Sequence, residues 1–132
     1  AWARHLRTLR VTLARRRDVL AAAVRRCLGD AAVPRLPTGG VHLWVRLDDR
    51  VDDTRLAARA AQAMLLVSAG RAWFPAEPTG AYLRLSFASA PESQLAPGVE
   101  TLARLVTELL KPSRRPLLRA PAKSTARRTL PR

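Results

Sequence analysis

The clearest pattern in the sequence lies in its first 28 residues, where apolar side chains recur at helical spacings. They are Trp2, Leu6, Leu9, Leu13, Leu20, Val24 and Leu28. Spacings of three, four and seven gather apolar groups on one face of a helix. Because Gly29 and Pro34 are residues at which helices commonly end, the pattern predicts one long helix that stops near residue 28.

The helical pattern is already in progress at Trp2. The sequence opens without methionine, and no Ser, Thr, Asp or Asn precedes Trp2 to cap a helix. We therefore expect the sequence to begin inside a helix of a longer protein.

The formal net charge of +14 is confined to two segments. Residues 1–28 contain eight arginines and one aspartate, and residues 112–132 contain six arginines, one lysine and no acid. In residues 29–111, nine basic side chains face nine acidic ones, so this part is neutral. A basic nucleic-acid-binding core is therefore disfavoured, and the arginines of the first helix are most simply a solvated face.

Two segments show the alternation of apolar and polar residues that predicts a strand with one buried face. The apolar positions are Val41, Leu43, Val45 and Leu47 in the first segment, and Leu83, Leu85 and Phe87 in the second. A shorter apolar run at residues 65–67 predicts a third strand that ends at residues 68–70.

Helices and a loop fill the remaining segments. A short helix is predicted from about Thr54, and a last helix over residues 92–110, in which Pro97 delays or kinks the start. Two prolines and a glycine make residues 73–80 a loop. The resulting order is helix, strand, helix, strand, loop, strand, helix. It predicts an α+β domain with a sheet of about three strands and helices on one face.

Residues 1–111 are predicted to form this domain, and residues 112–132 to be a disordered tail. The tail holds four prolines and seven positive charges, and so has too little apolar surface to offset the entropy of ordering. No apolar run approaches the roughly 20 residues of a membrane span, and no secretory signal precedes the first helix. Cys27 has no cysteine partner, so we expect a soluble cytoplasmic protein without disulfides or cysteine-ligated zinc.

The sequence offers few groups for catalysis. His5 and His42 are the only histidines, and their spacing forms no Ser-His-Asp or Cys-His arrangement. Gly39 and Gly40 are most simply a turn, because no phosphate-binding glycine motif surrounds them. The carboxylates at residues 48–53 could bind a metal, but capping of the following helix explains them better. No catalytic residue and no metal ligand is therefore predicted.

Arg84 is unusual because it occupies the middle of an otherwise apolar and aromatic strand. A planar guanidinium can hold a carboxylate through two parallel hydrogen bonds. The alternative is an arginine on the solvent face of a sheet edge. The residues alone favour neither interpretation.

Three motifs follow one another in the chain: PTGGVHLWV at residues 37–45, LVSAGRAWF at residues 66–74 and YLRLSFA at residues 82–88. In this order and spacing they resemble the small C-terminal domain of class I/II (fold type I) aminotransferases, which depend on pyridoxal phosphate. The resemblance covers about residues 1–110. It is closest to MocR-type regulators of the GntR family, in which a winged helix-turn-helix domain precedes an aminotransferase-like domain.

The resemblance implies a role for Arg84, which matches the strand arginine that binds the α-carboxylate of an amino-acid substrate in this family. It implies that Gly70 and Phe74 help to form the wall of the substrate cavity, and that Gly39 and Gly40 form a turn that lets the backbone approach. It further implies a parent protein that binds pyridoxal phosphate and an amino-acid substrate or effector. The parent would be a homodimer, with DNA as a partner if a winged-helix domain is present.

The Schiff-base lysine and the phosphate-binding residues of the family belong to a large domain outside this sequence. Lys111 and Lys123, the only lysines, lie outside the three motifs, so the chain alone is expected neither to bind the cofactor nor to transaminate. Whether the parent is a transaminase or a transcriptional regulator stays open. The competing hypothesis is a basic module that binds nucleic acid or an anionic surface. We also expect the isolated domain to self-associate, because Trp73, Phe74 and the apolar face of its first helix would pack against the large domain.

Overall fold

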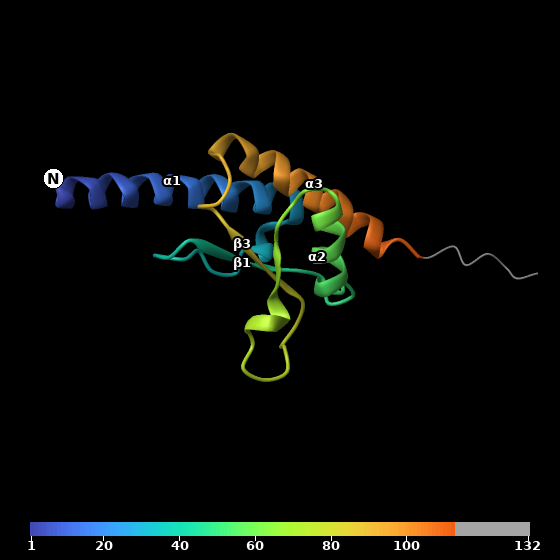
Figure 1. The fold of residues 1–132 in the computed structure, drawn as a ribbon. Coiled ribbons are helices and arrows are strands. Elements are labelled where there is room, and N and C mark those ends of the chain that lie inside the picture. Colours follow the sequence, from blue (N-terminus) through green and yellow to red (C-terminus); the bar gives the residue numbers. More distant parts are fainter. Residues whose placement is uncertain (113–132) are drawn as a thin grey trace, which may run out of the picture.

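The computed structural model describes residues 1–112, which form an α+β fold with three α-helices and one three-stranded sheet (Figure 1). The predicted fold class and order of elements are confirmed. The elements are α1 (Trp2–Leu28), the 3-10 turn η1 (Asp30–Ala32), β1 (His42–Arg46), α2 (Asp53–Gln62), β2 (Ser68–Ala69), the 3-10 turn η2 (Gly70–Trp73), β3 (Tyr82–Ser86) and α3 (Glu92–Leu110).

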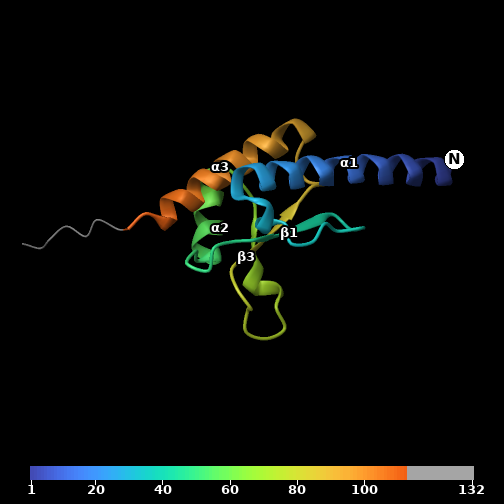
Figure 2. The same ribbon diagram turned by 180° about the vertical axis from the view of Figure 1, so that it is seen from behind.

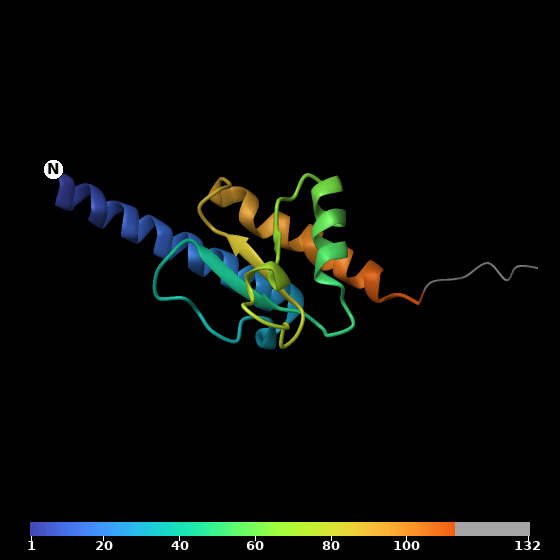
Figure 3. The ribbon, with the colours of Figure 1, turned by 60° about the horizontal axis from the view of Figure 1, so that its bottom comes forward.

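β3 is the central strand, with β1 and β2 antiparallel on either side. Burial alternates along β1 and β3, as the sequence predicted. One face of the sheet is buried against α1 and α3, which lie side by side (Figures 1 and 2). The other face, called the open face below, is turned away from these helices, as Figure 3 shows. Its partly exposed side chains are His42, Trp44, Arg46, Tyr82, Arg84 and Ser86.

Helix α1 extends well beyond the rest of the domain (Figure 1). Its buried residues all lie between Leu20 and Val24, where α1 packs against α3. Near the other end, Trp2 is 72% exposed and Leu9 is 43% exposed. The predicted apolar face is therefore covered in its C-terminal part, whereas Trp2 contacts only the ring of His5 on the same helix among the aromatic pairs of the described residues.

The predicted start of the third strand is wrong. The sequence placed the strand at residues 65–67 with its end at residues 68–70, but β2 consists of Ser68–Ala69 alone. A run of apolar residues indicates burial only if the backbone is also aligned with a neighbouring strand. Here the chain joins the sheet only at Ser68, and Leu66 is left 94% exposed.

The end of α2 explains this shift. Met64 has a φ of 61°, in the left-handed region. Its N–H donates to the carbonyl of Ala61 at 3.0 Å, and the N–H of Leu65 donates to that of Ala60 at 2.8 Å. These two bonds form the Schellman motif, which closes a helix and turns the chain sharply. Residues 65–67 are therefore used to leave the helix rather than to extend the sheet.

The last helix spans Glu92–Leu110, as predicted, and Pro97 lies inside it. Of the two effects expected of Pro97, a delayed start is therefore absent. The neighbouring Leu95 and Val99 are 5% and 3% exposed. Burial of these side chains stabilises the first part of the helix and outweighs the backbone hydrogen bond that proline cannot donate.

Of the predicted tail, only Pro112 falls within the described residues, and the remainder of residues 112–132 lies outside them. No helix within residues 1–112 has both the length and the hydropathy of a membrane span. Cys27 is a free, partly buried thiol on α1.

We expect Met64→Gly to stabilise the domain. The left-handed conformation of Met64 costs an L-residue about 1–2 kcal/mol, whereas glycine adopts it readily. Because Met64 is 90% exposed, little buried area is lost with its side chain. Urea denaturation followed by circular dichroism should show a gain of about 1 kcal/mol. Met64→Ala keeps the strained conformation, and an equal gain from that variant would contradict this explanation.

Candidate functional site

Arg84 lies at the centre of the open face. It is the middle residue of β3, opposite Trp44 of β1 and Ser68 of β2. Because β3 is paired on both sides at this position, Arg84 does not lie at a sheet edge, and that interpretation of the residue is wrong.

The guanidinium of Arg84 lies against an aromatic ring and has an unused donor. Its Cζ is 3.5 Å from the centroid of the Trp73 ring. Its Nε is buried, and no acceptor within residues 1–112 binds it. A buried N–H without a partner costs about 1–3 kcal/mol, so this group favours a ligand that brings an acceptor. A carboxylate would supply one in a charge-assisted hydrogen bond.

Arg46 is a neighbouring cation on the same face, but its donors are engaged within the chain. Its Nη1 donates to the carbonyls of Leu47 and Ala81 at 2.9 and 3.1 Å, and its Nη2 donates to Asp49 at 2.7 Å. Its Cζ lies 5.0 Å from the centroid of the Tyr82 ring. The two arginines therefore share an aromatic environment and differ in whether the chain supplies their acceptors.

Three further rings cluster on the open face. The ring centroids of Trp44 and Phe74 are 5.9 Å apart, those of Trp44 and Tyr82 6.0 Å, and those of Phe74 and Tyr82 5.6 Å. Trp73, which stacks on Arg84, is 51% exposed. The surroundings of Arg84 are thus largely aromatic, and hydrogen bonds to charged groups are less weakened by water in such a setting.

His42 borders the site on β1. Burial lowers the pKa of His42, and the positive charge of Arg84 lowers it further. His42 and Trp44 also line a hollow of about 420 Å³, together with residues of the loop that precedes β1. Trp44 is also the cross-strand neighbour of Arg84, but Arg84 itself does not line this hollow.

Gly70 and Phe74 lie near Arg84, since both pack against Tyr82 on the same strand. A Cβ on Gly70 would lie 2.6 Å from the Cβ of Tyr82 and 2.7 Å from its carbonyl oxygen. The backbone of η2 can therefore approach β3 only because residue 70 is glycine. Gly39 and Gly40 lie apart, in the loop before β1, where a Cβ on either would meet no atom within 4 Å. Gly40 has a φ of +74°, so its role within residues 1–112 is the turn itself.

The aspartates that follow β1 are used within the chain. Asp52 caps α2, as predicted, by accepting the N–H groups of Thr54 and Arg55 at 3.0 and 3.1 Å. Within the part of the chain that the structure describes, no group of three or more His, Cys, Asp or Glu side chains could hold a metal ion. The other three aspartates of this segment form ion pairs: Asp48 with Arg50, Asp49 with Arg46, and Asp53 with Arg71.

Asp53, which the sequence pattern attributed only to capping of the following helix, is 1% exposed. Its Oδ1 accepts from Arg71 Nε at 2.7 Å and from the Thr54 N–H at 2.9 Å, and its Oδ2 accepts the Arg71 N–H at 3.0 Å. Burial raises the pKa of Asp53, but the hydrogen bonds from Arg71 outweigh it and hold the pKa below its usual value. In the sequence, Asp53 directly follows the capping residue Asp52, so no pattern distinguishes the two aspartates.

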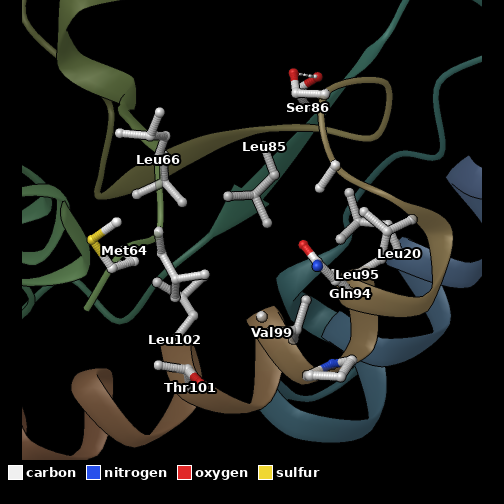
Figure 4. Close-up of a pocket in the computed structure, with 16 residues that line it drawn as sticks. Leu20, Met64, Leu66, Leu85, Ser86, Gln94, Leu95, Val99, Thr101 and Leu102 are labelled. Carbon is white, nitrogen blue, oxygen red and sulfur yellow. Dashed lines mark hydrogen bonds between the residues drawn. The ribbon is translucent and has the colours of Figure 1, made fainter.

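A second hollow, of about 440 Å³, lies between α3 and residues 64–67 (Figure 4). Leu20, Leu85, Leu95 and Leu102 contribute to its apolar walls, and none of its lining residues is charged. It therefore offers no cation to hold a carboxylate, and the open face around Arg84 remains the candidate site.

Among known proteins, the chain is similar to transcriptional regulators and to aminotransferases. No protein-family model matches the chain. It is 28% identical over 105 residues to the uncharacterised HTH-type transcriptional regulator YdfD of Bacillus subtilis, covering 80% of this chain and 21% of the regulator. It is 26% identical over 96 residues to aromatic-amino-acid aminotransferase 1 of Thermococcus litoralis, covering 73% of this chain and 23% of that protein.

A solved structure agrees with these relatives. Kynurenine aminotransferase of Pyrococcus horikoshii, in complex with PMP, superposes with a TM-score of 0.70 and 25% identity over 83% of this chain and 27% of the enzyme. The chain thus spans about a fifth of the length of the curated relatives it matches. The resemblance and the fold that it implied are confirmed, since these matches fit a C-terminal aminotransferase-like fragment.

We expect Gly70→Ala to destabilise the domain by about 1–3 kcal/mol, because the added Cβ would overlap Tyr82 and force η2 away from β3. Gly39→Ala is the matched control, with open space around the new methyl group and an expected change within about 0.5 kcal/mol. Urea denaturation measures both. Equal losses in the two variants would show that the contact with Tyr82 is not the cause.

His42 is expected to titrate below the ordinary histidine pKa of about 6.5 in the folded chain. Arg84→Gln should raise the pKa only part of the way, because burial is the larger cause. The unfolded chain binds a proton on His42 more readily than the folded chain does. The contribution of His42 to the free energy of unfolding is therefore fully present above about pH 6.5 and is lost as the pH falls below that value. NMR titration of the ring protons, with His5→Gln to isolate the signals of His42, measures the pKa. No change on replacing Arg84 would contradict their interaction.

Proposed function

We propose that this chain, a C-terminal aminotransferase-like fragment, supplies the carboxylate-binding arginine of a protein that depends on pyridoxal phosphate. Arg84 would hold the α-carboxylate of an amino acid. The observation that carries the proposal is the buried, unpartnered Nε of Arg84 in the middle of the sheet. A bidentate carboxylate would give this donor its missing acceptor and fix the orientation of the amino acid.

The surroundings of Arg84 support an amino-acid ligand. Gly70 and Phe74 would form one wall of the cavity, and the hollow lined by His42, Trp44 and Gly39 would receive the side chain of the ligand. Gly40 would shape the turn beside it. Aromatic and histidine rings favour a planar apolar side chain. The names of two relatives, an aromatic-amino-acid aminotransferase and a kynurenine aminotransferase, agree with such a ligand.

The parent protein would be either a transaminase or a MocR-type transcriptional regulator of the GntR family. The curated relatives include both an aminotransferase and an HTH-type regulator. In either case we expect a cytoplasmic homodimer that binds pyridoxal phosphate in its large domain. DNA would be a partner only of a parent that carries a winged-helix domain.

The residues around Arg84 do not by themselves fit pyridoxal phosphate. The open face contains no lysine to form a Schiff base, and Lys111, the one lysine within residues 1–112, follows the end of α3. We therefore assign no cofactor step to this chain. Its residues would bind and orient the carboxylate, and the electron sink would come from the cofactor of the parent.

The alternative function is binding of nucleic acid or an anionic surface through α1. The observation in its favour is that Arg4, Arg7 and Arg10 lie exposed on the projecting part of this helix. Against it, Arg15 and Arg26 form ion pairs with α3, which ties part of the basic face to the domain itself. This alternative assigns no role to the unpartnered donor of Arg84.

Titration of the 132-residue chain with 3-phenylpropanoate, monitored through the Arg84 Nε–H signal in NMR spectra, tests the proposed function. We expect Arg84→Gln to weaken binding by about tenfold or more, since hydrogen bonds to charged groups contribute about 1.5–3 kcal/mol. Arg84→Lys should restore only part of the affinity, because an ammonium cannot donate the parallel pair.

Arg46→Gln is the matched control, since it removes a stacked cation whose donors are already engaged. It should leave the affinity for 3-phenylpropanoate unchanged. Undiminished binding to Arg84→Gln, or equal binding of the neutral 3-phenylpropanamide to the wild type, would overturn the proposal. Carboxylate binding that depends instead on Arg4 and Arg7 would favour the alternative through α1.

A further inference from the structure

Asp53 is the one buried charged side chain among residues 1–112, and helix capping does not explain it. The capping of α2 is performed by Asp52, whose carboxylate accepts two backbone N–H groups of the first turn. Asp53 reaches instead across 18 positions of the sequence to Arg71. An ionised carboxylate is costly to bury unless hydrogen bonds replace its water, so these bonds require a structural explanation.

Asp53 holds the first part of η2 at two points. One carboxylate oxygen accepts the backbone N–H of Arg71 at 3.0 Å, and the other accepts its side-chain Nε at 2.7 Å. The first of these bonds fixes the main chain, which a surface ion pair would not do. The side chain of Arg71 is 56% exposed, so the contact is buried on the side of Asp53 and open on the other.

Both ends of this segment are held against the sheet. Gly70, the first residue of η2, packs on Tyr82 so closely that a Cβ would not fit, and Phe74, which follows η2, packs against Trp44 and Tyr82. Trp73 lies between these contacts and reaches across Arg84 with its ring centroid 3.5 Å from Cζ. Since Trp73 is 51% exposed, burial alone does not fix its position. We infer that its position is fixed by the contacts that hold the chain on both sides of it.

We propose that Asp53 is a positioning residue of the carboxylate site, which acts through Arg71 to hold Trp73 over the guanidinium of Arg84. Asp53 touches neither Arg84 nor a ligand, and its effect passes along two residues of η2. Stacking on the ring of Trp73 shields the Nε of Arg84 from water and fixes the direction of its N–H. The link between Asp53 and carboxylate affinity rests on the proposed function, whereas the position of Trp73 does not.

Two readouts test this proposal in the 132-residue chain. A guanidinium stacked on an indole ring has its Nε–H signal shifted upfield by the ring current, and Trp73→Leu gives the position of the unstacked signal. We expect Asp53→Asn to move the Arg84 Nε–H signal most of the way to that position, because an amide presents a donor to Arg71 where the carboxylate presented an acceptor. We also expect about a tenfold loss of affinity for 3-phenylpropanoate.

Asp52→Asn is the matched control. It removes the same charge from the adjacent position while its amide oxygen can still cap α2, and it should leave both the Nε–H signal and the affinity unchanged. If Asp53→Asn does not fold, Arg71→Gln is the test variant. Arg71 is half exposed, and its backbone hydrogen bond to Asp53 is retained in this variant. It should move the Nε–H signal in the same direction by a smaller amount.

An Arg84 Nε–H signal that stays at its wild-type position in the folded Asp53→Asn variant, or in Arg71→Gln where the first does not fold, would overturn the proposal. So would an equal shift in Asp52→Asn. A failure of the proposed function looks different: Arg84→Gln would then bind 3-phenylpropanoate as well as the wild type, while Asp53→Asn would still displace the Nε–H signal.

Discussion

The alternation of side chains along β3 places the core and the candidate site on opposite sides of one strand. Leu83 and Leu85 are buried against the helices, and Arg84 between them lies on the open face. Because successive residues of a strand point to opposite faces, burial of the two leucines fixes the direction of the arginine. A slip of one residue in the pairing with β1 would bury the charge and expose the core, so the hydrophobic core sets the register that the site needs.

The second requirement of the site is that residues 1–112 leave the Nε of Arg84 without an acceptor. Most other arginines near it are engaged: Arg46 binds two carbonyls and a carboxylate, and Arg71 binds Asp53. A neutral domain with nine acids for nine bases in residues 29–111 could easily have paired Arg84 as well. Aromatic side chains occupy that space instead. They favour the cation electrostatically without using its N–H donors, and so keep these donors for a ligand.

Local patterns in the sequence predicted most of the fold. Helical spacing gave α1 and α3, and alternation gave β1 and β3, because each of these signals lies within a single element. The position of β2 could not be predicted in this way, since it depends on the left-handed turn at Met64 rather than on the apolar run that follows. The stacking of Trp73 on Arg84 and the bond from Asp53 to Arg71 join residues 11 and 18 positions apart. No periodicity reports such contacts, so Arg84 could be proposed from the sequence but not the residues that hold its surroundings.

The proposed carboxylate site would suit an enzyme as well as a sensor, and the physical reason lies in what carboxylate binding does. Holding the α-carboxylate orients an amino acid but does not commit it to a reaction. A transaminase follows binding with proton transfers that need a lysine and the cofactor, whereas a regulator needs only a difference in affinity between two conformations. The open face of the described residues carries no lysine, and this chain spans about a fifth of the length of these relatives. Under the proposed function, the groups that face Arg84 across the open side of the sheet would therefore decide between an enzyme and a sensor.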